Sequence, residues 1–102
     1  MSAYLIASYD VKDNTTYQKY NPGSIGIIKE SIDKYGGNVL VATNESIWLA
    51  DSRNMVVVIE FPDMKSAQAW QEDSDYVGVK KYRLASTIKR FEVIAPSLSQ
   101  PS

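Results

Sequence analysis

Strand-like and helix-like segments follow one another along this chain in an order that few folds can accommodate. Four segments rich in β-forming residues cover residues 3–11, 38–43, 55–61 and 86–95. One helical stretch separates the first strand from the second, and another separates the third strand from the fourth. Because crossover connections are right-handed, this order predicts a ferredoxin-like α+β fold, with a four-stranded antiparallel sheet covered by helices on one face.

The two helical stretches carry recognisable start and stop signals. Asp13 or Asn14 can cap the first stretch, because a short polar side chain accepts a hydrogen bond from the exposed amides of a first helical turn. Pro22-Gly23 interrupts that stretch, and Gly36-Gly37 ends it. The second stretch begins after Asp63 and is broken once before the last strand. Each helical stretch is therefore expected to consist of two helical pieces.

The length of the chain favours a single domain. A chain of 102 residues is too short for two cores, so we predict one domain over residues 1–95. Residues 96–102 contain two prolines and three serines and are predicted to form a flexible tail. The first residues lack the basic start and apolar run of a signal peptide, and no stretch is long enough to span a bilayer. We therefore expect a cytoplasmic protein that does not bind membranes.

Two residue types are missing from the composition, and their absence excludes several chemistries. The chain has no cysteine and no histidine, so it cannot form disulfides, thiolate nucleophiles or a Ser-His-Asp triad. No calcium-loop spacing occurs, and we expect neither a metal nor a cofactor. The net charge is −1 and no basic stripe is evident, so we expect no nucleic-acid partner.

Side chains alternate between the two faces of a strand, so each predicted strand can be sorted into two sets. One set is predicted to lie beneath the helices: Leu5, Ala7, Tyr9, Val11, Met55, Val57, Ile59, Phe61, Phe91 and Val93. The other set is predicted to form an uncovered face: Tyr4, Ile6, Ser8, Asp10, Val56, Val58, Glu60, Ile88, Arg90, Glu92 and Ile94. This second set is too apolar for the free surface of a monomer. We therefore expect a homodimer in which two such faces pack together.

Four polar residues of the uncovered face are expected to meet at one end of the sheet: Ser8, Asp10, Glu60 and Arg90. This expectation assumes that the first and third strands are parallel neighbours. Two carboxylates, an arginine and a hydroxyl in a partly dry site can bind a small organic ligand, and Glu60 is our candidate for a proton-transfer group. The same cluster can instead be a salt-bridge network that fixes the geometry of the dimer. Both interpretations stay open.

Three further residues complete the predicted pocket. Trp70 and Tyr76 are expected mainly to pack at the seam between helices and sheet, with the mouth of a pocket as the alternative. Arg83 is expected either at the surface or turned into the end of the sheet, toward Glu60 or Asp10. In an enzyme, Arg83 or Arg90 would anchor an anion or an enolate.

Several short motifs occur along the chain in a characteristic order: Ala3-Tyr4-Leu5-Ile6-Ala7, Val11-Lys12-Asp13, Tyr35-Gly36-Gly37, Val57-Val58-Ile59-Glu60-Phe61-Pro62 and Ser74-Asp75-Tyr76. In these motifs the chain resembles the domain of unknown function 1330 family over nearly all of residues 3–95. The resemblance implies a dimeric α+β barrel, in a superfamily that also holds small monooxygenases and muconolactone isomerases.

Three hypotheses for the function follow. The first is a small-molecule-binding homodimer that could act as a minor metabolic enzyme with a carboxylate- and arginine-lined pocket. The second is a non-catalytic structural or interaction module. The third, a cofactor-free monooxygenase or isomerase, is implied by the superfamily alone.

Overall fold

The computed structural model describes residues 2–98, which form four strands and four helices. The elements follow in the order β1 (Ala3–Val11), α1 (Asn14–Tyr20), α2 (Ile25–Lys34), β2 (Asn38–Thr43), β3 (Met55–Phe61), α3 (Met64–Gln71), α4 (Ser74–Ser86) and β4 (Thr87–Pro96). Each predicted helical stretch is thus a pair of helices. The predicted order of strands and helices is confirmed.

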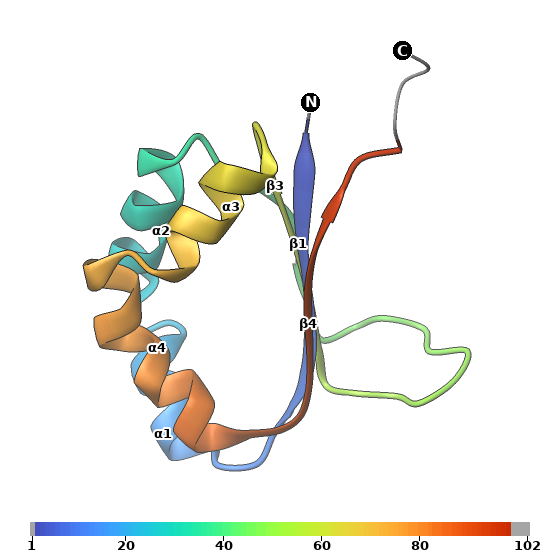
Figure 1. Cartoon of the computed structure of the whole chain (residues 1–102). Helices are drawn as coiled ribbons and strands as arrows, with labels where there is room; N and C mark the ends of the chain where they lie inside the picture. The colour runs from blue at the N-terminus through green and yellow to red at the C-terminus, as the bar shows by residue number, and fades with distance from the viewer. Residues whose placement is uncertain (1, 99–102) are drawn as a thin grey trace.

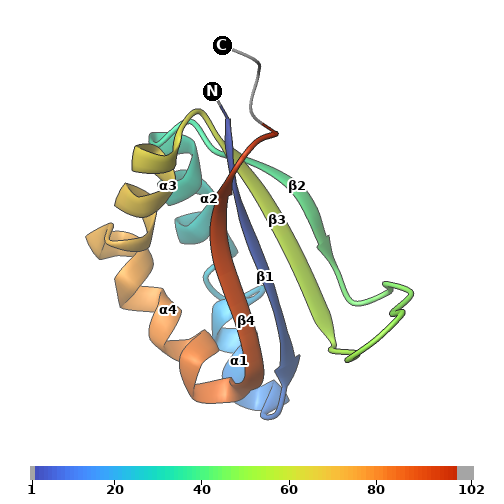
Figure 2. The ribbon, with the colours of Figure 1, turned by 45° about the vertical axis from the view of Figure 1, so that its right-hand side comes forward.

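The four strands form one sheet in the order β2-β3-β1-β4, as Figure 2 shows. All helices lie on the same face of this sheet, and the loop between β2 and β3 projects on the opposite side (Figure 1). This is the predicted ferredoxin-like α+β fold. Every neighbouring pair of strands is antiparallel, including β1 and β3. The expectation of parallel first and third strands is therefore wrong.

The direction of β3 has a simple cause. A helical crossover returns the chain to the start of the sheet, so β1 and β2 run the same way. The connection from β2 to β3 is a hairpin, which reverses the chain. Because β3 then pairs with β1, these two central strands run in opposite directions.

Aspartates begin three of the four helices. The Asp13 side chain accepts a hydrogen bond from the amide of Thr16 at the start of α1, and Asp63 does the same for Ser66 at the start of α3. The Asp73 side chain accepts from the amides of residues 75 and 76 at the start of α4. These contacts satisfy amides that have no partner within the helix, and they fix where each helix begins.

The end of α2 depends on two glycines. Gly36 has φ of +74°, a left-handed conformation that glycine adopts without strain and that commonly ends a helix. A β-carbon on Gly37 would lie 2.6 Å from the Ile32 side chain and 2.8 Å from the Phe61 ring. The close approach of α2 to the end of β3 therefore requires the absence of a side chain at position 37.

A β-bulge in β4 changes which residues face the helices. Ser8 pairs with Phe91 and Asp10 pairs with Ile88, so β4 uses three steps where β1 uses two. Lys89, with φ of +55°, lies at this bulge. The extra residue reverses the alternation of every later side chain in β4.

The predicted assignment of the faces is consequently wrong for most of β4. Cross-strand partners share a face, so Phe91 and Val93 lie with Ser8 and Ile6 on the uncovered face. Glu92 pairs with Ala7 and contacts the helices, and Ile94 packs against the core. In β1 and β3 the register agrees with the predicted sorting: Leu5 pairs with Ile59 beneath the helices.

We define the open face by the residues that the register places away from the helices. The open face comprises Tyr4, Ile6, Ser8, Asp10, Asn38, Val41, Thr43, Val56, Val58, Glu60, Ile88, Phe91, Val93 and Ala95. Phe91 is 50% exposed, and Val41 and Val93 are each 38% exposed. The opposite, helix-covered face contains the buried core.

The core is unusually aromatic. The Trp70 ring stacks on the Tyr76 ring with centroids 3.9 Å apart, and Phe61 lies 5.7 Å from Trp70. The indole N–H of Trp70 donates to the hydroxyl of Ser31 on α2, at 2.9 Å. Trp70 therefore joins α3 to α2, α4 and the sheet. Trp70 and Tyr76 are both buried at this seam between the helices and the sheet.

The end of the domain lies slightly beyond the predicted boundary. β4 continues through Pro96, and the Ser97 amide donates to the Ser2 carbonyl at 2.8 Å. Residues 99–102 of the predicted flexible tail lie outside the described residues. Within residues 2–98, the helices are too short or too polar to cross a membrane.

Candidate functional site

The antiparallel sheet separates the polar residues that were predicted to converge. Glu60 pairs with Tyr4 near the start of β1, whereas Asp10 pairs with Ile88 near its end. Tyr4 and Asp10 are six residues apart on one strand, which corresponds to about 20 Å. The predicted cluster of Ser8, Asp10, Glu60 and Arg90 therefore does not form within one chain.

Each member of that predicted cluster has its own surroundings. Asp10 accepts a hydrogen bond from the Asn54 amide at 2.8 Å and thereby holds the β2–β3 loop to β1. Glu60 accepts from the Tyr4 hydroxyl at 3.3 Å, and Ser8 is buried within the open face. The Arg90 guanidinium donates to the Thr87 carbonyl at 2.6 Å and so closes the end of α4. The contacts of Asp10 and Glu60 thus join neighbouring elements of the fold, whereas that of Arg90 lies within β4.

The other three predicted pocket residues meet around a cavity between the helices and the sheet. This cavity has a volume of about 110 Å³. Its aromatic and polar lining consists of Tyr9, Tyr17, Tyr20, Asn21, Trp70, Tyr76, Arg83 and Glu92. Aliphatic side chains from β1, β2, β3 and α2 complete the walls. We call this space the Arg83 cavity.

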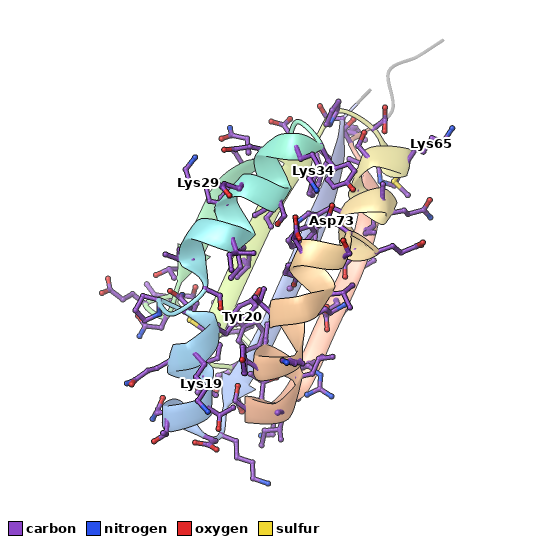
Figure 3. All side chains as sticks on the ribbon, turned by 90° about the vertical axis from the view of Figure 1, so that its left-hand side faces the viewer. Lys19, Tyr20, Lys29, Lys34, Lys65 and Asp73 are labelled. Carbon is purple, nitrogen blue, oxygen red and sulfur yellow. The ribbon has the colours of Figure 1, made fainter. Side chains whose placement is uncertain are left out.

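Two pairs of tyrosines that line the cavity are joined through their hydroxyls. The Tyr9 and Tyr17 hydroxyls are hydrogen-bonded at 2.7 Å, and the Tyr20 and Tyr76 hydroxyls at 3.2 Å. Figure 3, which views the molecule from the helix side, shows Tyr20 between the ribbons of α1 and α4. Each pair joins elements that are distant in sequence or lie in different layers, because β1 supplies Tyr9 and α4 supplies Tyr76.

Arg83 is the buried cation of this site. Its side chain comes from α4 and is only 4% exposed. Its Nη2 donates to Glu92 Oε1 at 3.0 Å, and its guanidinium carbon lies 5.4 Å and 5.9 Å from the ring centroids of Tyr9 and Tyr20. Its Nη1 is buried and has no hydrogen-bond partner within the described part of the chain. Arg83 thus packs over aromatic rings, as a buried guanidinium commonly does, and retains unused donors.

Burial and neighbouring charges set the ionisation of the cavity. Burial raises the pKa of Tyr9 and of Tyr20, and their hydroxyl partners raise both further. Burial alone would also raise the pKa of Glu92, but its hydrogen bond and ion pair with Arg83 outweigh that effect and hold the pKa below its usual value. At neutral pH the cavity therefore combines neutral phenols, a cationic guanidinium and one partly exposed carboxylate.

The sequence contained a signal for the tyrosines that our predictions did not use. Tyr17 and Tyr20 lie three apart on one helical face, and Tyr9 was assigned to the covered side of β1. A tyrosine beneath a helix needs a partner for its hydroxyl, so a covered face with several tyrosines implies a polar cluster. Glu92 was missed for a different reason, because the bulge at Lys89 moves it to the helix side.

Metal chemistry finds no support in this region. Within residues 2–98, acidic side chains do not gather in groups of three or more that could hold a metal ion. The chemistry available in the cavity is hydrogen bonding, charge stabilisation and proton transfer by phenols or by Glu92.

A comparison with known protein families identifies the family of the chain. A model of the domain of unknown function DUF1330 matches residues 2–96. The chain belongs to the DUF1330 family. None of the curated proteins compared with this DUF1330 protein matches it in sequence.

Solved structures similar to this DUF1330 protein share its fold at low sequence identity. A protein of unknown function from Rhodopseudomonas palustris is 13% identical, with a TM-score of 0.70, over 97% of this chain and 84% of the other. A dimeric ferredoxin-like protein of unknown function from Jannaschia sp. CCS1 is 8% identical, with a TM-score of 0.71, over 92% and 97%. A protein from Nitrosomonas europaea named "Putative antibiotic biosynthesis monooxygenase" is 19% identical, with a TM-score of 0.70, over 95% and 90%.

Proposed function

We propose that this DUF1330 protein is a small-molecule-binding homodimer, with the Arg83 cavity as the ligand site and the open face as the dimer interface. The single observation that carries the ligand site is the buried Arg83 guanidinium, whose Nη1 has no partner among the described residues. A buried donor without a partner costs stability, typically about 1–3 kcal/mol. A bound ligand that accepts a hydrogen bond from Nη1 would remove this cost.

The shape and lining of the cavity support the same proposal. Ligand sites are usually concave and mainly apolar, with a few polar groups that orient the ligand. The Arg83 cavity has this composition, because aliphatic and aromatic walls surround one cation and two hydroxyl pairs. Perturbed ionisation at Tyr9, Tyr20 and Glu92 is also typical of functional sites.

The proposed interface rests on the apolar character of the open face. Tyr4, Ile6, Val56 and Val58 are only partly buried in one chain, and Phe91 is half exposed. A contiguous apolar surface of this kind usually marks an interaction site. The neighbour from Jannaschia sp. CCS1 is described as dimeric, which supports a second copy of this chain as the partner.

The β2–β3 loop adds to the proposed interface. Ile47 and Leu49 are 91% and 97% exposed at its tip, and the loop projects on the open-face side (Figure 1). Trp48, Ile6 and Phe91 line one hollow between this loop and the open face. In a dimer formed through the open faces, the loop would pack against the partner subunit and bury these side chains.

Glu60 has a different role in this proposal from the one that the sequence suggested. It lies on the open face, whereas the Arg83 cavity lies beneath the helices. Glu60→Gln should therefore change dimer stability and leave ligand binding intact. If the Arg83 cavity supports a reaction, the proton-transfer groups that line it are the tyrosine hydroxyls and Glu92.

Native mass spectrometry of protein purified from its own host tests both parts of the proposal. We expect a two-chain mass with a reproducible small adduct, and loss of the adduct in Arg83→Met. Lys65→Met is the matched control, because Lys65 is an exposed residue of α3 that points away from the molecule in Figure 3. A single-chain mass at micromolar concentration would overturn the dimer, and an adduct that persists in Arg83→Met would overturn the cavity as its site.

The second candidate function is a non-catalytic interaction module. The exposed Ile47 and Leu49 favour it, because a module of this kind needs an apolar contact surface and no cavity. A two-chain mass that never carries an adduct, together with loss of assembly on substitution of these residues, would favour this function over the first.

A further inference from the structure

The Arg83 cavity has a marked imbalance between hydrogen-bond donors and acceptors. In each tyrosine pair, one hydroxyl proton forms the bond between the two oxygens, and the other proton remains available. Arg83 Nη1 adds further N–H donors that have no partner within residues 2–98. The one carboxylate at the cavity, Glu92, already accepts from Arg83 Nη2. Among the described residues, the buried polar group that lacks a partner at the cavity is therefore a donor, which requires an acceptor.

The charge of the cavity also favours a ligand that supplies hydrogen-bond acceptors. Arg83 is permanently cationic, and Glu92 is its ion-pair partner at 3.0 Å. The Glu92 side chain is 27% exposed, so solvent screens part of its charge, whereas the Arg83 side chain is only 4% exposed. Because burial holds Tyr9 and Tyr20 in their neutral forms, no phenolate competes with a bound anion. An anionic group in the cavity would meet a cation, neutral donors and a carboxylate, Glu92, that is already paired with Arg83.

The walls and volume define the rest of the ligand. Apart from the residues already named, the lining is mostly aliphatic. The volume of about 110 Å³ is somewhat below that of an apolar cavity that holds benzene, about 150 Å³. A compact apolar body of about four heavy atoms suits this space.

We infer that the Arg83 cavity binds a small carboxylate with a compact apolar body, whose oxygens accept hydrogen bonds from Arg83 Nη1 and from the spare hydroxyl protons of the tyrosine pairs. This inference rests on the proposed function, because it names the ligand class of the same site. A carboxylate presents two acceptor oxygens and no donor, which complements the cavity. A cationic or donor-rich ligand would leave the Arg83 donors unpaired.

Isothermal titration of the full chain with isovalerate and with isovaleramide tests the inference. The two probes share the same branched apolar body, but only isovalerate is charged and free of donors. We expect isovalerate to bind at least tenfold more tightly than isovaleramide. Arg83→Met should weaken isovalerate binding by roughly tenfold to a hundredfold and reduce this preference, whereas Lys65→Met should change neither affinity.

Tyr20→Phe keeps the inference testable if Arg83→Met does not fold. This variant retains the ring and removes one hydroxyl, so isovalerate binding should weaken by roughly twofold to tenfold, with isovaleramide binding changed less. Equal binding of the two probes, or unchanged isovalerate binding in Tyr20→Phe and Arg83→Met, would overturn the carboxylate and leave the cavity as a ligand site. Binding of neither probe at millimolar concentration would overturn the carboxylate inference. The host-purified adduct in native mass spectrometry would then decide the proposed function separately.

Discussion

The two faces of the sheet differ in how they treat polar groups. On the helix-covered face, Tyr9, Arg83 and Glu92 form hydrogen bonds and ring contacts around a cavity. On the open face, Val58 lies between Ile6 and Val41, and Phe91 lies beside Ser8. Glu60 accepts a hydrogen bond from Tyr4 near the end of β3. The centre of the helix-covered face carries more polar side chains than the centre of the open face. In this molecule, the polarity of a side chain therefore does not indicate whether it is exposed.

The largest expected effect concerns the packing of the covered face. Trp70→Ala removes the ring that stacks on Tyr76 and donates to Ser31, so the free energy of unfolding should fall by about 3–5 kcal/mol. Denaturant titration followed by circular dichroism measures this change. Val77→Ala, at an exposed position on α4, is the control and should cost less than about 1 kcal/mol. Equal losses in the two variants would contradict the assigned core.

The next effect concerns the open face. Val93→Glu places a charge where we propose that two subunits meet, so the dissociation constant of the dimer should rise by at least roughly a hundredfold. Sedimentation velocity over a range of concentrations measures it. Val77→Glu introduces the same charge at an exposed position on α4 and should leave assembly unchanged. A dimer that survives Val93→Glu would move the interface to another surface.

A smaller effect tests the ion pair of the cavity. Glu92→Gln leaves Arg83 without its anion, and stability should fall by about 1.5 kcal/mol, near the low end for a hydrogen bond to a charged group because Glu92 is partly exposed. Urea midpoints at neutral pH measure the loss, with the exposed Glu30→Gln on α2 as the control. A neutral outcome for Glu92→Gln would mean that solvent already compensates the Arg83 charge.

The smallest expected effect is a pH dependence outside both faces. Hydrogen bonds from Lys34 and Tyr35 lower the pKa of Asp73 to about 2, and Figure 3 shows Lys34 and Asp73 close to each other. Because this folded-state pKa lies below the usual 3.8, the charged form stabilises the fold above about pH 4, and that contribution is lost as the pH falls toward 2.

Asp73→Asn isolates this charge, because asparagine still caps a helix. The difference in stability between wild type and Asp73→Asn should stay constant from pH 7 to about pH 4 and then shrink toward zero near pH 2. Asp33→Asn, in an exposed pair with Lys29, should show little difference at any pH. A difference between wild type and Asp73→Asn that grows on acidification would contradict the assigned direction.

Much of the fold could be predicted from the sequence because its signals are local. The bounds of β1, β2 and β3, the caps at Asp13 and Asp63, and the glycine stop after α2 all depend on residues within one or two turns. The antiparallel pairing of β1 and β3 was also available, since a crossover followed by a hairpin dictates it. Glu60 and Asp10 were predicted to meet only because β3 was expected to run parallel to β1.

The composition of the site was harder to predict for a physical reason. The bulge depends on a positive φ at Lys89, a residue with no special preference for that conformation, so the sequence gives no warning. Arg83 was expected at the surface or at the sheet end, and its partner Glu92 on the uncovered face, so their ion pair was not predicted. One unpredictable backbone angle therefore hid the ion pair and, with it, the polar centre of the cavity.

The bulge at Lys89 also decides the parity of β4, that is, whether its odd-numbered or its even-numbered side chains face the helices. If the same residues paired without the bulge, every side chain from Phe91 to Ala95 would exchange its inward or outward position. Phe91 would then pair with Ala7 beneath the helices, and Glu92 would pair with Ile6 on the open face.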